Sequence, residues 1–215
     1  GRMTAPSGAE GSVTVIGAVS PQGGDFSEPV TQNTQRFVRC FWALDRQLAY
    51  ARHFPSINWN TSYSEYYADL LPWYREHLGA DFDATRSRIV GLLNEESKLL
   101  EIVKLIGSDV LPDDQKLIIE TARVIRQGFL QQNAMHETDT YMAPESQLAM
   151  LRIILRLYDA GRTLTARAIP LRCLTDTGVF AALCRMKFGL GAGDKPEKYE
   201  KLVDDAAASV LAANA

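Results

Sequence analysis

The sequence lacks the features that most directly assign a function. Its 215 residues contain no apolar run of about 18 residues, so no segment is expected to cross a membrane as a helix. The phosphate-binding string GxxxxGK[ST] is absent, and so are the GxSxG, HExxH and EF-hand patterns. Lys plus Arg number 23 against 26 Asp plus Glu, so the basic excess of nucleic-acid-binding proteins is missing.

Cysteine and histidine are too few and too scattered for a metal site. No CxxC pair occurs, and the histidines fit no ligand spacing. We expect three reduced, mostly buried thiols, as in a cytosolic protein. The residues are Cys40, Cys173 and Cys184, and His53, His77 and His136.

The composition is that of an ordinary globular chain, with 46% apolar and 23% charged residues. This length fits one or two domains. Gly1-Arg2-Met3 carries no apolar secretory core and does not begin with Met, so we expect a chain that is processed, tagged or cut from a longer one.

Strand-like and turn-like patterns dominate residues 1–64. Residues 11–19 are rich in β-branched side chains and predict a strand buried on both faces. Residues 20–34 predict the longest loop, because Pro29 and an earlier proline break any helix. Within it, Gly23-Gly24-Asp25 fits a tight turn better than an anion nest.

Residues 35–53 fit both a helical and a strand period. Asp45 is an acceptable N-cap, so a strand to about residue 43 and a helix from 46 is one solution. Residues 54–60 predict a turn, since Pro55 disfavours the helical region at Phe54.

From residue 64 onward the apolar spacing is helical. Gly107 is placed to end one helix and Pro144 to begin another. Glu95 and Glu96 are expected opposite the apolar stripe of their helix. The expected segments are helices at 64–78 (interrupted or kinked at Pro72), 84–106, 113–130, 144 to before Pro170, 171–186 and 195–212, a polar loop at 131–143 and a flexible glycine joint at 189–193.

Together these patterns predict a small α/β piece followed by a helical bundle. One strand and one ambiguous strand do not make a stable sheet, so residues 1–64 look like the end of a domain. Phe54-Pro55 and the loop at 131–141, with Met135 and Tyr141, are each typical of packing. Together they would form an apolar slot for a flat ring.

Three long strings identify a family resemblance. SVTVIGAVSPQGGDFSEPVTQNT, FWALDRQLAYARHFPSINWNTSYS and FLQQNAMHETDTY resemble the catalytic subunit of V-type and archaeal A-type rotary ATPases, over residues 11–188. The resemblance implies a mainly α chain, with a C-terminal helical bundle preceded by the truncated end of an α/β P-loop nucleotide-binding domain. The implied parts are 1–64 (nucleotide-domain remnant), 65–188 (helical domain) and 189–215 (linker and extra helix).

The resemblance also implies site residues. Phe54 would pack on adenine and be fixed by Pro55, while 36–43 would be a strand and 45–52 a helix. Met135 stands where most relatives carry an aromatic, so stacking there would be weaker. The loop residues that would close the other side are Gln132, Ala134, Met135 and Tyr141. The acidic turn that would contact the rotor contains Asp109, Leu111, Pro112, Asp113 and Asp114.

By the same resemblance, ATP or ADP with Mg²⁺ binds the full-length catalytic subunit. The phosphate-binding and catalytic residues lie upstream in the family, so we expect no catalytic residue, no metal site, no tightly bound cofactor and no ATP hydrolysis in this chain alone. Implied partners are the non-catalytic subunit, which alternates with the catalytic one in a hexamer, and the central stalk subunits, without nucleic acid. The complex would sit peripherally on the cytoplasmic side of a membrane.

Two other hypotheses compete with this one. A stand-alone helical interaction module would expose no apolar face, whereas a partial nucleotide domain would expose residues 12–19 and 37–42. A non-catalytic nucleotide-binding paralogue would lack the P-loop lysine in its full-length sequence.

Overall fold

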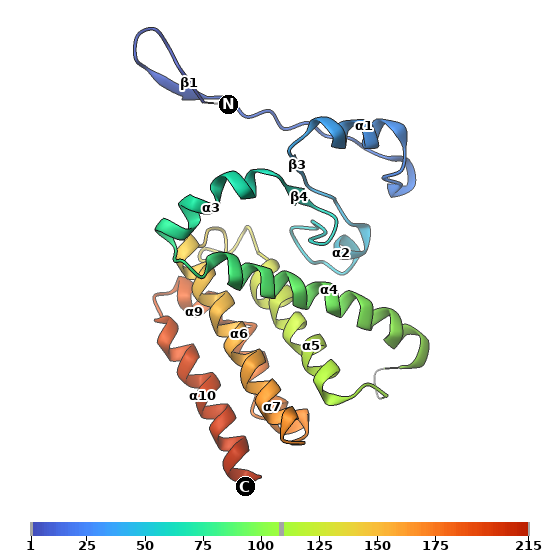
Figure 1. Cartoon of the computed structure of the whole chain (residues 1–215), viewed down its shortest axis with the longest axis vertical. Coiled ribbons are helices and arrows are strands. Elements are labelled where there is room, and N and C mark those ends of the chain that lie inside the picture. The colour runs from blue at the N-terminus through green and yellow to red at the C-terminus, as the bar shows by residue number, and fades with distance from the viewer. Residues whose placement is uncertain (1, 108–109, 215) are drawn as a thin grey trace. The chain divides into compact units, whose positions relative to one another are not determined.

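The computed structural model describes residues 2–107 and 110–214, and most of them are helical (Figure 1). The chain divides into two compact units, Gly1–Phe41 and Trp42–Ala215. No helix in the described part is both long enough and apolar enough to cross a membrane. The mainly α fold predicted from the sequence is therefore confirmed.

The first unit contains little regular sheet. Its antiparallel hairpin pairs Arg2 with Ser12 and Thr4 with Glu10. The Gly23-Gly24 segment is a tight turn closed by Asp25, whose Oδ1 accepts from the Ser27 amide at 2.9 Å. The elements are β1 (Arg2–Thr4), β2 (Glu10–Ser12), the 3₁₀ turn η1 (Gln22–Gly24), α1 (Pro29–Phe37) and β3 (Cys40–Phe41).

Two predictions for this unit are wrong. The strand expected at 11–19 ends at Ser12, and Val15 and Ile16 are 88% and 80% exposed. No strand in the described residues pairs with 13–19, and an unpaired strand has no ladder hydrogen bonds to hold it. The loop expected at 20–34 ends at Glu28, because Pro29 takes the first position of α1, where a proline needs no N–H.

The ambiguous segment resolves into shorter elements than the family resemblance implied. The expected strand at 36–43 is reduced to β3, since α1 continues to Phe37. In the second unit, α2 (Arg46–Tyr50) begins where expected, with Asp45 as its cap. The Asp45 carboxylate accepts from the amides of Gln47 and Leu48 at 2.7 and 3.2 Å, which satisfies two otherwise free helix donors.

The rest of the second unit is a bundle of helices (Figure 1). The helix α3 runs through Pro72 without ending, and Gly107 caps α4 with a φ of 84°, as predicted. The bounds are β4 (Tyr63–Ser64), α3 (Tyr66–His77), α4 (Phe82–Ile106), α5 (Asp113–Val124), the π-helical segment η2 (Ile125–Leu130), α6 (Pro144–Ala166), α7 (Leu171–Thr175), α8 (Val179–Leu183), α9 (Met186–Gly191) and α10 (Pro196–Ala213).

The long helix α6 is the centre of this bundle. It contacts α4, α5 and α10, and Figure 1 shows α10 running along it. Its Ile153, Ile154 and Leu157 are fully buried, so its apolar face spreads over more than one stripe. Gly161 allows α5 to approach closely, because a Cβ there would lie 2.6 Å from Leu117 Cδ1.

Three further predictions for the bundle are wrong. The helix expected at 171–186 is divided by Gly178, which adopts a φ of 78°. Glu96 is buried rather than solvated, and it pairs with Arg126 at 2.8 Å. Gly189 lies inside α9 instead of in a flexible joint, because its missing side chain makes room for Tyr199. The cysteines are unpaired but half-buried, not mostly buried.

Candidate nucleotide-base site

The turn after α2 presents Phe54. Its ends are tied together, because Asn58 donates its amide N–H to the Ala43 carbonyl at 2.8 Å and Asp45 donates to Ser56 at 2.9 Å. The Phe54–Pro55 peptide bond is cis, and Phe54 is 52% exposed. The turn therefore holds an aromatic ring half out of the protein.

The carboxylate of Asp45 reinforces this turn. Its Oδ2 accepts from the Asn58 side-chain amide at 2.8 Å, in addition to the helix-capping bonds on Oδ1. Partial burial opposes ionisation, but the hydrogen bonds from Asn58, Leu48 and Gln47 outweigh it and hold the pKa of Asp45 below its ordinary value. The cap is thus a charged group at neutral pH.

His53 fastens the same turn to the bundle. Its imidazole is buried and meets the edge of Trp59 at a ring-centroid distance of 5.6 Å. Burial lowers the pKa of His53, and the positive charges of Arg126 and Lys187 lower it further. The ring is therefore neutral at physiological pH and acts as a packing group.

The structure brings the two predicted halves of the site together. The Gln132 N–H donates to the Phe54 carbonyl at 2.7 Å, and the Gln131 side chain reaches the Arg52 carbonyl at 3.4 Å. Segments about 80 residues apart in sequence are thereby joined. Phe54 and Pro55 lie on one side of this junction, and the loop after η2 begins on the other.

That loop is held by its own side chains. Asp139 Oδ2 accepts from the Asn133 amide at 2.7 Å, and the Thr140 hydroxyl donates to the Ala134 carbonyl at 2.9 Å. The loop presents Met135 and Tyr141 outward, at 94% and 77% exposure. A compact loop thus displays the side chains that the family resemblance singled out, and burial of such surface would come only with a ligand or another surface.

A buried ion pair anchors the loop to α9. Lys187 Nζ lies 2.8 Å from Asp139 Oδ2 and donates to the Gln131 carbonyl at 2.6 Å. The two side chains are only 7% and 4% exposed. The sequence analysis missed both residues, because one lies in an apparently polar loop and the other in an expected short helix. Their separation of 48 positions gives no local signal.

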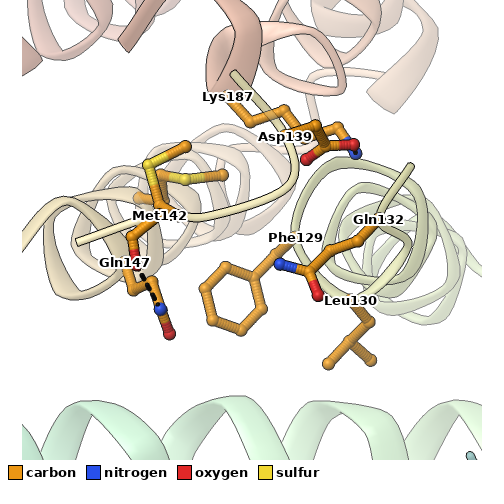
Figure 2. A pocket seen from close by; sticks show the side chains of 8 residues that line it. Phe129, Leu130, Gln132, Asp139, Met142, Gln147 and Lys187 are labelled. Carbon is orange, nitrogen blue, oxygen red and sulfur yellow. Dashed lines mark hydrogen bonds and ion pairs between the residues drawn. The ribbon is translucent and has the colours of Figure 1, made fainter. Parts of the chain in front are cut away.

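A hollow of about 160 Å³ opens beside this pair. Figure 2 shows the Phe129 ring and the Gln132 amide on one side, with Met142 and Gln147 across from them. The Gln147 side chain donates to the Met142 carbonyl at 2.8 Å. Ligand pockets usually measure about 300–1,000 Å³, so this hollow is not a complete pocket by itself. Its lining is Phe129, Leu130, Gln132, Asp139, Met142, Gln147, Met150 and Lys187.

The predicted rotor-contacting residues have different surroundings. Asp109 lies outside the described residues. Leu111 is buried, which makes it an anchor of the turn, whereas Pro112 and Asp114 are exposed. Asp113 Oδ2 accepts from the Leu171 amide at 2.8 Å, so this acid ties α5 to the start of α7.

The chemistry of the exposed groups suits a base better than a metal. In the part of the chain that the structure describes, no three His, Cys, Asp or Glu side chains gather as metal ligands do. The Phe54 and Tyr141 rings instead provide π-faces, on which a flat heterocycle stacks.

Two family models match the chain. The nucleotide-binding domain of the ATP synthase alpha/beta family matches residues 1–64, and the C-terminal domain of V and A type ATP synthase matches residues 71–166. The match at 71–166 covers α4, α5, η2 and α6, with the loop that carries Met135 and Tyr141.

Individual relatives agree with the family models. The V-type ATP synthase alpha chain of Halothermothrix orenii is 52% identical over 194 residues, which is 90% of this chain and 33% of the relative. The V-type ATP synthase alpha chain 2 of Clostridium tetani is 54% identical over 181 residues, 84% of this chain and 31% of the relative. The corresponding A-type ATP synthase protein of Natronomonas pharaonis is 48% identical over 205 residues, 95% of this chain and 34% of the relative.

The chain spans about a third of the length of the curated relatives it matches. The two matched domains lie in the order in which the helical bundle follows the nucleotide-binding segment, and the identity is near one residue in two. The chain therefore belongs to the family of V-type and A-type ATP synthase alpha chains, as a C-terminal part of such a chain.

Proposed function

We propose that this chain supplies the base side of an ATP or ADP site in a rotary ATP synthase or ATPase. The observation that carries the proposal is the 2.7 Å hydrogen bond from the Gln132 N–H to the Phe54 carbonyl. It joins the aromatic turn to the loop that presents Ala134, Met135 and Tyr141. Pro55 shapes the turn, and the exposed rings then provide the stacking surface for adenine.

Energy divides unequally between the two ends of the nucleotide. An aromatic pair contributes about 0.5–1.5 kcal/mol beyond its buried area. Contacts to phosphates and their Mg²⁺ dominate binding in P-loop enzymes, and the GxxxxGK[ST] string is absent from these residues. The chain thus tunes the affinity for the base, while the triphosphate and Mg²⁺ are held by residues outside it.

In the assembled machine, hydrolysis or synthesis of ATP would be coupled to rotation and to proton or sodium transport. The non-catalytic subunit would complete the nucleotide site in an alternating hexamer, and the complex would lie peripherally on the cytoplasmic face of a membrane. We assign residues 1–64 to the nucleotide domain, 65–188 to the helical domain and 189–215 to a linker with an extra helix.

The turn between α4 and α5 is the proposed contact to the central stalk. Pro112 and Asp114 are its exposed residues, while Leu111 and Asp113 hold it in place and Asp109 belongs to the same turn. A hinge between the Phe54 turn and the bundle would pass the motion from nucleotide to rotor.

A stand-alone helical interaction module is the alternative function. It requires a chain that buries its apolar surface, but Val15, Phe37 and Trp42 are 88%, 87% and 61% exposed. The exposure expected for a partial nucleotide domain is therefore confirmed, and it favours the role in an ATP synthase.

Two measurements test the proposal. Isothermal titration of this chain with ATP and Mg²⁺ should give no dissociation constant below about 1 mM, equivalent to about −4 kcal/mol. In the assembled ATPase, Phe54→Ala should raise the KM for ATP about 2- to 10-fold with little change in kcat, because base stacking is shared by ground and transition states. Micromolar binding by the isolated chain, or an unchanged KM in the variant complex, contradicts the proposal.

A further inference from the structure

We propose that Lys187 is a positioning residue for the nucleotide base, acting through the loop that follows η2. This inference rests on the proposed function, because it concerns the same base-side loop. Lys187 does not belong to that loop and presents no atom among its exposed side chains. Its role is to hold the loop in the conformation that meets the base.

The first argument is the convergence of bonds on one ammonium group. Lys187 Nζ binds the Gln131 carbonyl at 2.6 Å and the Asp139 carboxylate at 2.8 Å. Gln131 is the first residue of the loop and Asp139 lies eight positions later, so one cation holds both arms. The Asp139 carboxylate in turn accepts from the Asn133 amide at 2.7 Å.

The second argument is the position of these bonds relative to Phe54. Gln132 lies between Gln131, which Lys187 holds, and Asn133, which Asp139 holds. Its own N–H donates to the Phe54 carbonyl. A shift of the Lys187 ammonium would therefore move the residue that joins the loop to the aromatic turn.

The third argument is burial. The Lys187 and Asp139 side chains are 7% and 4% exposed, and Figure 2 shows them together at one rim of the hollow. A buried pair is costly to form and seldom adds net stability over apolar residues of similar size. Its best-attested benefit is to specify one arrangement, which here is that of the base-side loop.

The decisive experiment compares Lys187→Met with Lys198→Met in the assembled ATPase. Lys198 also pairs with an aspartate at 2.8 Å, but it is 61% exposed and lies on α10, so it is a matched control. Lys187→Met should raise the KM for ATP about 3- to 10-fold with kcat within about twofold, as expected for lost ground-state positioning. Lys198→Met should change neither.

A second variant addresses failure to assemble. Asp139→Asn keeps the shape and one acceptor oxygen but removes the charge, and it should raise the KM in the same direction by a smaller factor. If Lys187→Met does not assemble, Asp139→Asn decides the matter. Hydrogen exchange gives an independent readout: either variant should accelerate exchange of the Asn133 and Gln132 amides while leaving the centre of α6 unchanged.

The outcomes separate this inference from the proposed function. If Phe54→Ala raises the KM and neither Lys187→Met nor Asp139→Asn does, the positioning role is wrong and the base site stands. If Phe54→Ala also leaves the KM unchanged, the proposed function fails first. Equal losses of kcat and assembly in Lys187→Met and Lys198→Met would show a merely structural role and overturn the proposal.

Discussion

Gly161→Ala should destabilise the helical bundle, although alanine is the better helix former. A Cβ at this position would lie 2.6 and 2.9 Å from the two Cδ atoms of Leu117 and 3.3 Å from its Cγ. Leu117 is fully buried, so its side chain has no free space to enter. Replacing glycine by alanine inside a helix gains about 1 kcal/mol, while overpacking a core costs about 1–3 kcal/mol.

Gly91→Ala supplies the matched control. Gly91 lies inside α4, and nothing approaches within 4 Å of the Cβ that alanine would add. It should therefore stabilise by roughly 0.5–1 kcal/mol from helix propensity alone. Because that gain is common to both variants, the difference between them isolates the overpacking at Leu117, expected at about 1–3 kcal/mol.

Urea unfolding of the chain, followed by far-UV circular dichroism, measures both free energies. Adding Leu117→Val to Gly161→Ala should cost less than Leu117→Val alone, since the two sites share one contact. Equal stabilisation by Gly161→Ala and Gly91→Ala would refute the close approach of α5 and α6.

Two further predictions concern carboxylates. Burial raises the pKa of Glu96 despite the nearby Arg126, so the ionised form disfavours folding, and stability is lost as pH rises from the ordinary value of 4.5 through the higher folded value. Glu96→Gln should remove that loss, and urea midpoints that still fall across this range would contradict the burial. Asp45 has a lowered pKa, so its contribution is present above its ordinary value of 3.8 and disappears as pH falls through the lower folded value. Asp45→Ala should cost about 0.5–2 kcal/mol at neutral pH and little in acid, whereas an equal cost at both would exclude the charged cap.

Local chemistry explains which elements were predictable. The Asp45 cap, the Gly107 C-cap and the Pro144 start are set by residues a few positions apart, and all three are present. The strand at 11–19 was not predictable, because its periodicity speaks only for a surface to bury and not for a partner strand. Glu96 was misplaced for a similar reason, since only Arg126, 30 positions away, makes its burial tolerable.

The candidate site divides in the same way. Sequence strings alone pointed to Phe54, Pro55 and the loop with Met135 and Tyr141, and to the ATP synthase family to which the chain belongs. Whether these residues serve adenine stays a prediction. No string indicated that Lys187 and Asp139 would hold the loop.

The sequence by itself determined the helices, their caps and the family, because these depend on residue order over short distances and on long matching strings. Only the tertiary structure decided the junction of Gln132 with Phe54 and the burial of Lys187 against Asp139. These contacts join segments tens of residues apart, and their geometry exists only after α6 and its neighbours have packed. Close packing, rather than local propensity, therefore places the groups that would meet a nucleotide.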